Sequence, residues 1–134
     1  MEKCELCGKK AAKTICIKCR RLICESCESP EAMLCRECYE FKRSLEDQRE
    51  LVLNYIEKML NVCSLKIQNQ LCLRCNVLRE LAISLYKMLR DLLEEANKEL
   101  FEGILNRGKK IEKELKRLLV IILTVQGLSI APEP

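Results

Sequence analysis

The chain has 134 residues, of which 49% are hydrophobic and 33% charged, and it carries a formal net charge of +4. A chain of this length forms one domain, or a small module followed by a helical body. Histidine is absent, which excludes imidazole metal ligands, histidine general bases and Ser-His or Cys-His catalysis within one chain.

Four closely spaced cysteine pairs open the chain, and they contain eight of its eleven cysteines. Two Cys-x2-Cys turns can complete one tetrahedral zinc site, so four pairs predict two zinc ions. So short a segment holds too few large apolar residues to fold unaided, and we expect metal to replace the missing core. The gaps of eight, four and seven residues leave sequential, nested and interleaved pairing open. The pairs are Cys4 and Cys7, Cys16 and Cys19, Cys24 and Cys27, and Cys35 and Cys38.

The residues around these pairs predict a small β/α finger. Two short segments, 13–17 and 21–24, have the apolar and β-branched composition of strands and predict a hairpin. Ser29 and Pro30 are the residue types preferred at the N-cap and the first position of a helix. A short helix beginning at Pro30 would place the last cysteine pair on one face.

The two central cysteine pairs resemble the heart of a B-box zinc finger. An apolar residue precedes the third and the fifth ligand, and four residues separate the two pairs, whereas a RING finger usually has a shorter gap. B-boxes usually place histidine, and sometimes aspartate, at several ligand positions, but here all eight are cysteine. The matching stretches are Ile15-Cys16-x2-Cys19 and Ile23-Cys24-x2-Cys27.

This resemblance covers residues 1–38 and implies the interleaved cross-brace, in which alternate pairs bind one ion. Under this pairing the first zinc ion would be held by Cys4, Cys7, Cys24 and Cys27, and the second by Cys16, Cys19, Cys35 and Cys38.

The rest of the chain has a helical pattern. Neither glycine nor proline occurs between Glu31 and Glu102, which predicts helix over a long span. Apolar residues recur in steps of three and four, as in a coiled coil, and neighbouring apolar residues widen the face enough for more than one partner helix. The recurring positions are Val52, Ile56, Met59, Cys63, Ile67, Leu71, Cys75, Leu78, Ala82, Leu85, Leu89, Leu92 and Ala96.

We therefore expect a zinc-binding module at 1–41, a helical interaction and oligomerisation region at 42–128, and a tail at 129–134. One uninterrupted helix would need a second chain to cover it, whereas a break near 64–69, which we favour, would give a hairpin. The sequence Asn-Arg-Gly at 106–108 predicts a further turn. The expected fold is a small zinc-stabilised β/α finger plus an all-α helical hairpin or coiled-coil body.

Three cysteines lie outside the four pairs: Cys63, Cys72 and Cys75. Buried thiols, a disulfide such as Cys63–Cys72, and a third metal site all remain open for them. The abundance of Lys, Glu, Leu and Ile without Trp suggests a thermophilic source. The first residues lack the apolar segment of a signal peptide, so we expect a cytoplasmic or other reducing compartment, where paired cysteines bind metal rather than form disulfides.

Two basic clusters lie at 9–21 and 109–117. Each Zn(Cys)4 centre carries a charge of about −2, so two centres would cancel the formal net charge. We interpret the first cluster as compensation for thiolate charge, with a nucleic-acid-binding patch as the alternative. The apolar run Leu118–Val125 is shorter than the roughly 20 residues that span a bilayer, so we expect no transmembrane segment.

A B-box-like finger followed by coiled-coil sequence resembles part of the tripartite-motif architecture, here without a separate RING. In that family these parts mediate protein contacts and self-assembly. The resemblance implies a non-enzymatic zinc-binding protein that contacts a protein partner and homo-oligomerises, with a dimer favoured. The alternatives are a nucleic-acid-binding transcriptional regulator that uses one of the basic clusters and a ubiquitin-ligase-like adaptor. The sequence contains neither a phosphate-binding glycine loop nor a nucleophile–base pair, so we do not expect an enzyme.

Overall fold

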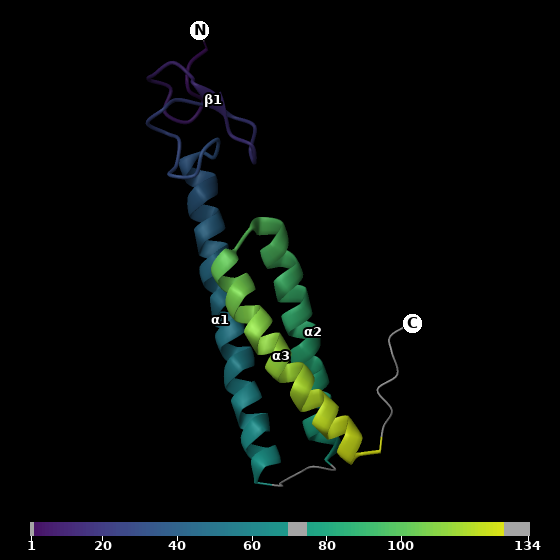
Figure 1. The fold of residues 1–134 in the computed structure, drawn as a ribbon. Coiled ribbons are helices and arrows are strands. Elements are labelled where there is room, and N and C mark those ends of the chain that lie inside the picture. Colours follow the sequence, from purple (N-terminus) through teal and green to yellow (C-terminus); the bar gives the residue numbers. More distant parts are fainter. Residues whose placement is uncertain (1, 70–74, 128–134) are drawn as a thin grey trace. The chain divides into compact units, whose positions relative to one another are not determined.

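The structure is a computed structural model that describes residues 2–69 and 75–127 (Figure 1). The chain divides into two compact units, an N-terminal unit, Met1–Asp47, and a C-terminal unit, Gln48–Pro134. The expected combination of a small sheet with cysteine clusters and a helical body is confirmed. The elements in chain order are β1 Thr14–Ile15, β2 Leu22–Ile23, α1 Arg36–Gln68, α2 Asn76–Glu99 and α3 Glu102–Val125.

The N-terminal unit contains the predicted hairpin. Strands β1 and β2 pair antiparallel, with Thr14 opposite Ile23 and Ile15 opposite Leu22. Among the residues of this unit that the structure describes, the buried core has seven members, and five of them are cysteines. The other two, Ile23 and Leu34, are aliphatic. Sulphur atoms therefore occupy the positions that hydrocarbon fills in an ordinary domain core.

The predicted helix from Pro30 is wrong, because the chain forms a turn before α1 begins at Arg36. The Ser29 hydroxyl accepts the Glu31 N–H at 3.2 Å, as an N-cap would. However, the Ser29 N–H donates to the Leu34 carbonyl at 2.8 Å, and Met33 has φ +60°. These contacts close a loop instead of starting a helix, and only Cys38 of the last pair lies in α1.

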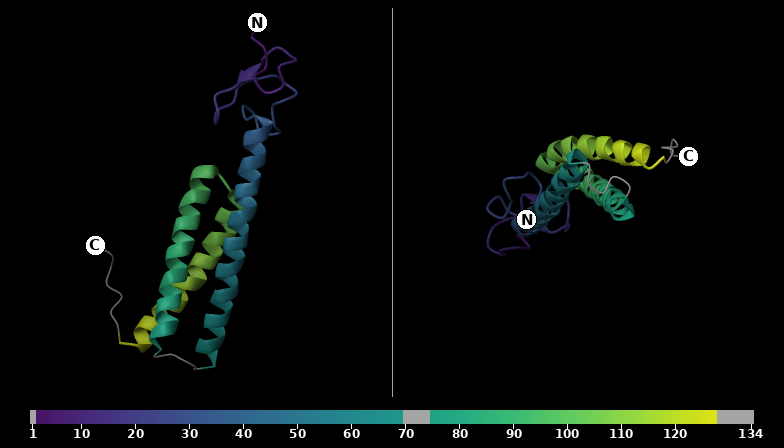
Figure 2. Two further views of the ribbon diagram at one scale, coloured as in Figure 1. Left: turned by 180° about the vertical axis from the view of Figure 1, so that it is seen from behind. Right: turned by 90° about the horizontal axis from the view of Figure 1, so that it is seen from below.

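The helices of the C-terminal unit run alongside one another (Figure 2), and each of them buries a mainly apolar face. The buried positions of α2 are the six predicted ones, Leu78, Ala82, Leu85, Leu89, Leu92 and Ala96. In α3 the buried positions are Ile104, Gly108, Ile111, Leu115, Leu118 and Ile122. In α1 the buried positions are Leu53, Ile56, Leu60 and Cys63.

The buried face of α1 is rotated from the predicted one. Val52 and Met59 were expected in the core but are half-buried, because Leu53 and Leu60 take those places. The predicted core position Leu71 lies outside the described residues.

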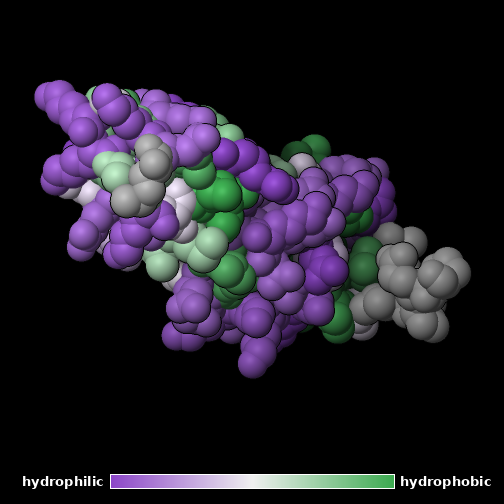
Figure 3. All heavy atoms as spheres, turned by 90° about the horizontal axis from the view of Figure 1, so that it is seen from above, coloured by the Kyte–Doolittle hydropathy of each residue, from purple (hydrophilic) through white to green (hydrophobic). Residues whose placement is uncertain are grey.

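The face drawn in Figure 3 is largely hydrophilic, with smaller hydrophobic areas.

One of the two expected helix breaks lies where the sequence places it. Helix α1 ends at Gln68, inside the expected stretch 64–69. The turn expected at 106–108 is wrong, since α3 runs through these residues without interruption. The second break lies instead at Leu100, which adopts a left-handed conformation with φ +60°, while the Phe101 N–H closes the end of α2 on the Ala96 carbonyl at 2.9 Å. No glycine marks this end of the helix.

Gly108 has a packing role instead. A Cβ atom at this position would lie 2.5 Å from Leu93 Cδ2 and 3.8 Å from Leu89 Cδ1 of α2. Real carbon atoms do not approach so closely, so the missing side chain lets α3 approach α2.

Ion pairs connect each pair of helices in the C-terminal unit. Arg49 of α1 pairs with Glu95 of α2. Glu57 of α1 pairs with Arg107 of α3 at 2.8 Å, and Arg90 of α2 pairs with Glu112 of α3 at 3.1 Å. Pairs this exposed contribute at most about 1 kcal/mol each, so they support the packing without dominating it. Across the described residues, no helix has the length and apolar character needed to cross a membrane.

Candidate metal centres

The structure brings the eight paired cysteines together as two groups of four. In each group, all four sulphur atoms lie within 4.8 Å of one another. The pairing is the interleaved one that the B-box resemblance implies. The first tetrad is Cys4, Cys7, Cys24 and Cys27, and the second tetrad is Cys16, Cys19, Cys35 and Cys38.

The sulphur separations fit a tetrahedral metal ion. Four sulphur atoms at a zinc–sulphur distance of about 2.3 Å form a tetrahedron with edges of about 3.8 Å. The distance from Cys7 Sγ to Cys24 Sγ is 3.7 Å, and that from Cys19 Sγ to Cys35 Sγ is 3.8 Å. A disulfide bond would need about 2.05 Å. Each tetrad can therefore hold one metal ion, and the arrangement is compatible with two zinc ions.

The first cysteine pair of each tetrad lies in a backbone turn of its own, and the two turns have the same conformation. The Gly8 N–H donates to the Cys4 carbonyl at 2.9 Å, and the Arg20 N–H donates to the Cys16 carbonyl at 2.9 Å. The residue after the second cysteine is left-handed in both turns, with φ +69° at Gly8 and +66° at Arg20. This reversal aims both sulphur atoms of a Cys-x2-Cys turn at one point.

The second pair of each tetrad lies in a helical turn. In the first tetrad, the Cys27 and Glu28 N–H groups both donate to the Cys24 carbonyl at 3.1 Å. In the second tetrad, the Cys38 N–H donates to Cys35 Sγ at 3.4 Å as α1 begins. A ligand pair at the start of α1 thus belongs to the second tetrad.

Hydrogen-bond donors favour the thiolate form at the first two cysteines of each tetrad, each of which has a lowered pKa. Burial is the largest single influence on Cys4 and Cys16 and raises the pKa of each. Together, however, N–H groups from the neighbouring turns lower the pKa of each to about 6. Burial, followed by the surrounding sulphur atoms, raises the pKa of Cys27 and of Cys38 to about 12. Metal binding must therefore displace protons from the last cysteine of each tetrad.

Two charged residues lie beside the second tetrad: Arg21, which belongs to the basic cluster at 9–21, and Glu37, which no sequence pattern singled out. The Arg21 guanidinium donates from Nε to Cys19 Sγ at 3.2 Å and from Nη2 to Cys35 Sγ at 3.6 Å. Its Nη2 also donates to Glu37 Oε2 at 2.8 Å. The hydrogen bonds that Arg21 donates to Cys19, and then to Glu37, raise the pKa of Arg21 above its usual value. For Arg21, this contact agrees with the interpretation that basic residues compensate thiolate charge.

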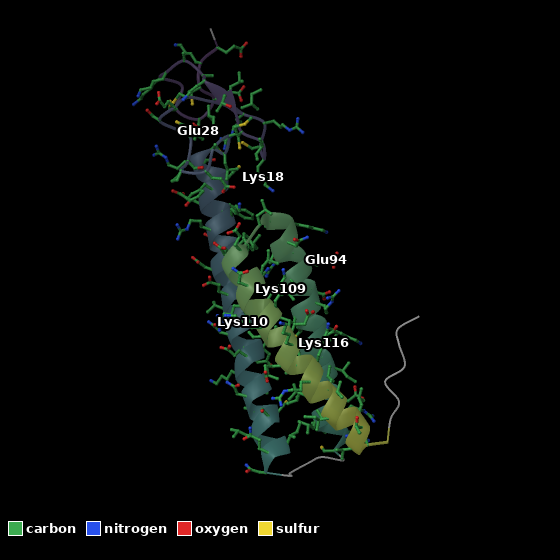
Figure 4. All side chains as sticks on the ribbon, in the orientation of Figure 1. Lys18, Glu28, Glu94, Lys109, Lys110 and Lys116 are labelled. Atoms are coloured by element: carbon green, nitrogen blue, oxygen red, sulfur yellow. The ribbon has the colours of Figure 1, made fainter. Side chains whose placement is uncertain are left out.

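The second basic cluster is exposed on α3. Lys109, Lys110 and Lys116 lie along this helix (Figure 4). Arg117 of the same cluster pairs with Glu114 at 3.0 Å.

The remaining cysteines do not form a third metal site among residues 2–69 and 75–127. Cys63 is fully buried in the C-terminal unit, and burial raises the pKa of its thiol. It therefore packs as a small apolar side chain. Cys75 precedes α2, and its carbonyl accepts the Gln126 side-chain amide at 3.2 Å. Cys72 lies outside the described residues. Cys63, its partner in the disulfide that the sequence left open, is a free thiol.

Comparison with known proteins gave no match: no protein-family model, no curated protein and no solved structure matches the chain.

Proposed function

We propose that this chain is a non-enzymatic zinc-binding protein that makes protein–protein contacts and self-associates through its helices. The two complete sulphur tetrads carry the proposal. Four cysteine ligands fill every position around a tetrahedral ion, so neither ion keeps an open position for water or substrate. Zinc in such a site is structural, and it serves to hold the N-terminal unit in shape.

The finger is a B-box-like cross-brace in this proposal. The interleaved tetrads and the β1–β2 hairpin between their ligands support it. Cysteine at all eight ligand positions distinguishes this finger from the usual B-box pattern. Sulphur ligands and tetrahedral geometry favour zinc over calcium or magnesium, which prefer oxygen.

An apolar stripe on α1 supports self-association. Leu51, Tyr55, Val62 and Leu65, which we call the α1 stripe, are between 39% and 60% exposed. Their steps of four, seven and three residues follow the heptad spacing by which one helix packs along another. The opposite face of α1 already packs inside the C-terminal unit. A second helix laid along the α1 stripe would cover its exposed apolar groups.

A second copy of this chain in antiparallel orientation fits the α1 stripe best. Lys58 occupies the heptad position in the middle of the stripe and is exposed. A parallel pair would place Lys58 against its own copy, and like charges repel. An antiparallel pair can place Leu51 opposite Val62 and Tyr55 opposite Lys58, where the ammonium group faces an aromatic ring. We therefore infer an antiparallel dimer.

Native mass spectrometry tests both parts of this proposal in one spectrum. We expect two zinc ions per chain and a dimer, and we expect Tyr55→Glu to give a monomer that keeps both ions. Val77→Glu is the matched control, because Val77 is 73% exposed on α2 and lies outside the stripe. One zinc ion or none would contradict the metal sites. A wild-type monomer at micromolar concentration would contradict self-association.

Nucleic-acid binding is the second candidate, favoured by the exposed lysines of α3. Phosphate contacts by Lys109, Lys110, Lys113 and Lys116 would give an affinity that falls steeply with salt. A gel-shift assay with random duplex at low and moderate salt tests this candidate. The absence of a shift at either concentration would exclude it.

A further inference from the structure

The two tetrads share one backbone plan, which makes their differences informative. The first sulphur of each, Cys4 and Cys16, accepts N–H groups from the second and third residues after it and from the third cysteine of its tetrad. The second sulphur of each accepts the N–H group two residues later, which belongs to Lys9 in the first tetrad and to Arg21 in the second. Lys9 and Arg21 are therefore equivalent positions in a repeated turn.

Their side chains behave differently. The Arg21 guanidinium contacts Cys19 Sγ at 3.2 Å and Cys35 Sγ at 3.6 Å, and Glu37 holds it in place at 2.8 Å. Within the described residues, the Lys9 side chain has no hydrogen bond to a sulphur atom. The next residue, Lys10, directs its ammonium group to the Ser26 hydroxyl at 2.6 Å.

The Arg21 contact connects two parts of the second tetrad. Cys19 belongs to the turn between the strands, whereas Cys35 lies immediately before α1. A guanidinium that donates to both sulphur atoms offsets the negative charge of the bound thiolates and keeps the two segments together. Removing a partner that hydrogen-bonds a metal ligand typically costs 10–100-fold in metal affinity.

We propose that Arg21 is a positioning residue that makes the second tetrad the tighter metal site, so that metal leaves the two sites in a defined order. This inference rests on the proposed zinc-binding function. The first tetrad empties first, and the chain passes through a state with one ion, held by Cys16, Cys19, Cys35 and Cys38. In that state the ligand pair at the start of α1 is still bound.

A chelator titration of the full-length reduced protein tests the order. Zinc per chain is counted by native mass spectrometry, and the cysteines exposed at each step are alkylated and mapped by peptide mass. We expect a one-zinc species in which the cysteines of the first tetrad are alkylated and those of the second tetrad are protected. Equal alkylation of both tetrads in that species would overturn the inference.

Variants then assign the order to Arg21. We expect Arg21→Gln to lower the zinc affinity of the second tetrad by about 10–100-fold, which removes or reverses the order. Arg20→Gln is the matched control, because it makes the same charge change at the adjacent exposed residue, and it should keep the order. Arg21→Lys retains the charge but not the two-pronged contact, so we expect an intermediate affinity.

A spectroscopic readout separates a positioning role from a loss of fold. With cadmium in place of zinc, the two sites should give two ¹¹³Cd resonances, and Arg21→Lys should shift only the resonance of the second tetrad. Equal behaviour of the Arg21→Gln and Arg20→Gln variants would refute the role of Arg21. A wild-type protein that binds fewer than two ions would instead contradict the proposed function itself.

Discussion

Complete removal of metal should unfold the N-terminal unit and leave the helices of the C-terminal unit intact. Over residues 2–47, the core of the N-terminal unit buries two aliphatic side chains, Ile23 and Leu34. Their burial contributes roughly 3–6 kcal/mol at 1.5–3 kcal/mol each, whereas one structural zinc ion contributes about 10–16 kcal/mol. The hydrocarbon of this unit therefore cannot replace even one ion.

The C-terminal unit does not depend on metal in this way. Helices α2 and α3 bury nine leucine and isoleucine side chains, which contribute roughly 14–27 kcal/mol by the same measure. A strong chelator under reducing conditions should collapse the dispersed amide signals of residues 2–35 in a ¹H–¹⁵N correlation spectrum. The signals of α2 and α3 should keep their positions, and far-ultraviolet circular dichroism should retain most of its helical amplitude.

Two controls make this test decisive. Adding zinc back should restore the lost signals, and Cys63→Ala should still bind two ions because Cys63 belongs to neither tetrad. Cys24→Ala, in contrast, should lose one ion. If residues 2–35 keep dispersed signals after mass spectrometry shows a metal-free chain, the reasoning that sulphur–metal bonds replace a core is refuted.

Two further predictions concern helix packing and helix ends. Gly103→Ala should stabilise the protein by about 0.5 kcal/mol through helix propensity, since an added Cβ there meets no atom within 4 Å. Gly108→Ala in the same helix should instead destabilise the protein by about 1 kcal/mol, and in a Leu93→Ala background this destabilisation should disappear. Urea denaturation measures the free energy of unfolding of each variant. Equal effects of the two Gly→Ala substitutions would contradict the close approach of α3 to α2. Leu100→Gly should raise the free energy of unfolding by about 1 kcal/mol because glycine adopts the left-handed conformation without strain, and an unchanged urea midpoint would count against that strain.

Local patterns in the sequence correctly predicted the parts of the protein that depend on short-range chemistry. The Cys-x2-Cys spacing singled out the eight cysteines that the structure gathers into two tetrads, because two thiols three residues apart can reach one ion whatever the surrounding fold. The B-box resemblance implied the interleaved pairing that the structure has. The stripe from Leu78 to Ala96 predicted the buried face of α2, because a regular helix preserves its 3.6-residue period.

Other features depend on what each segment packs against. In α1 both Val52 and Leu53 are apolar, and contact with the neighbouring helices decided that Leu53 is buried. A glycine in a sequence indicates either a turn or a close approach between two segments of the chain. Only the packing of α3 against Leu93 of α2 shows that Gly108 marks a close approach.

The same holds for the end of α2 and for the surroundings of the metal centres. Leu100 reverses the chain without a glycine, because docking of α3 against α2 outweighs the strain at one residue. Lys9 and Arg21 occupy matching places in two equivalent turns, yet only the folded chain brings Glu37 and a second sulphur within reach of Arg21. The sequence by itself determined which atoms can bind metal and which helix faces are apolar. The tertiary structure decided which charged groups surround those atoms, because residues far apart in the chain supply them.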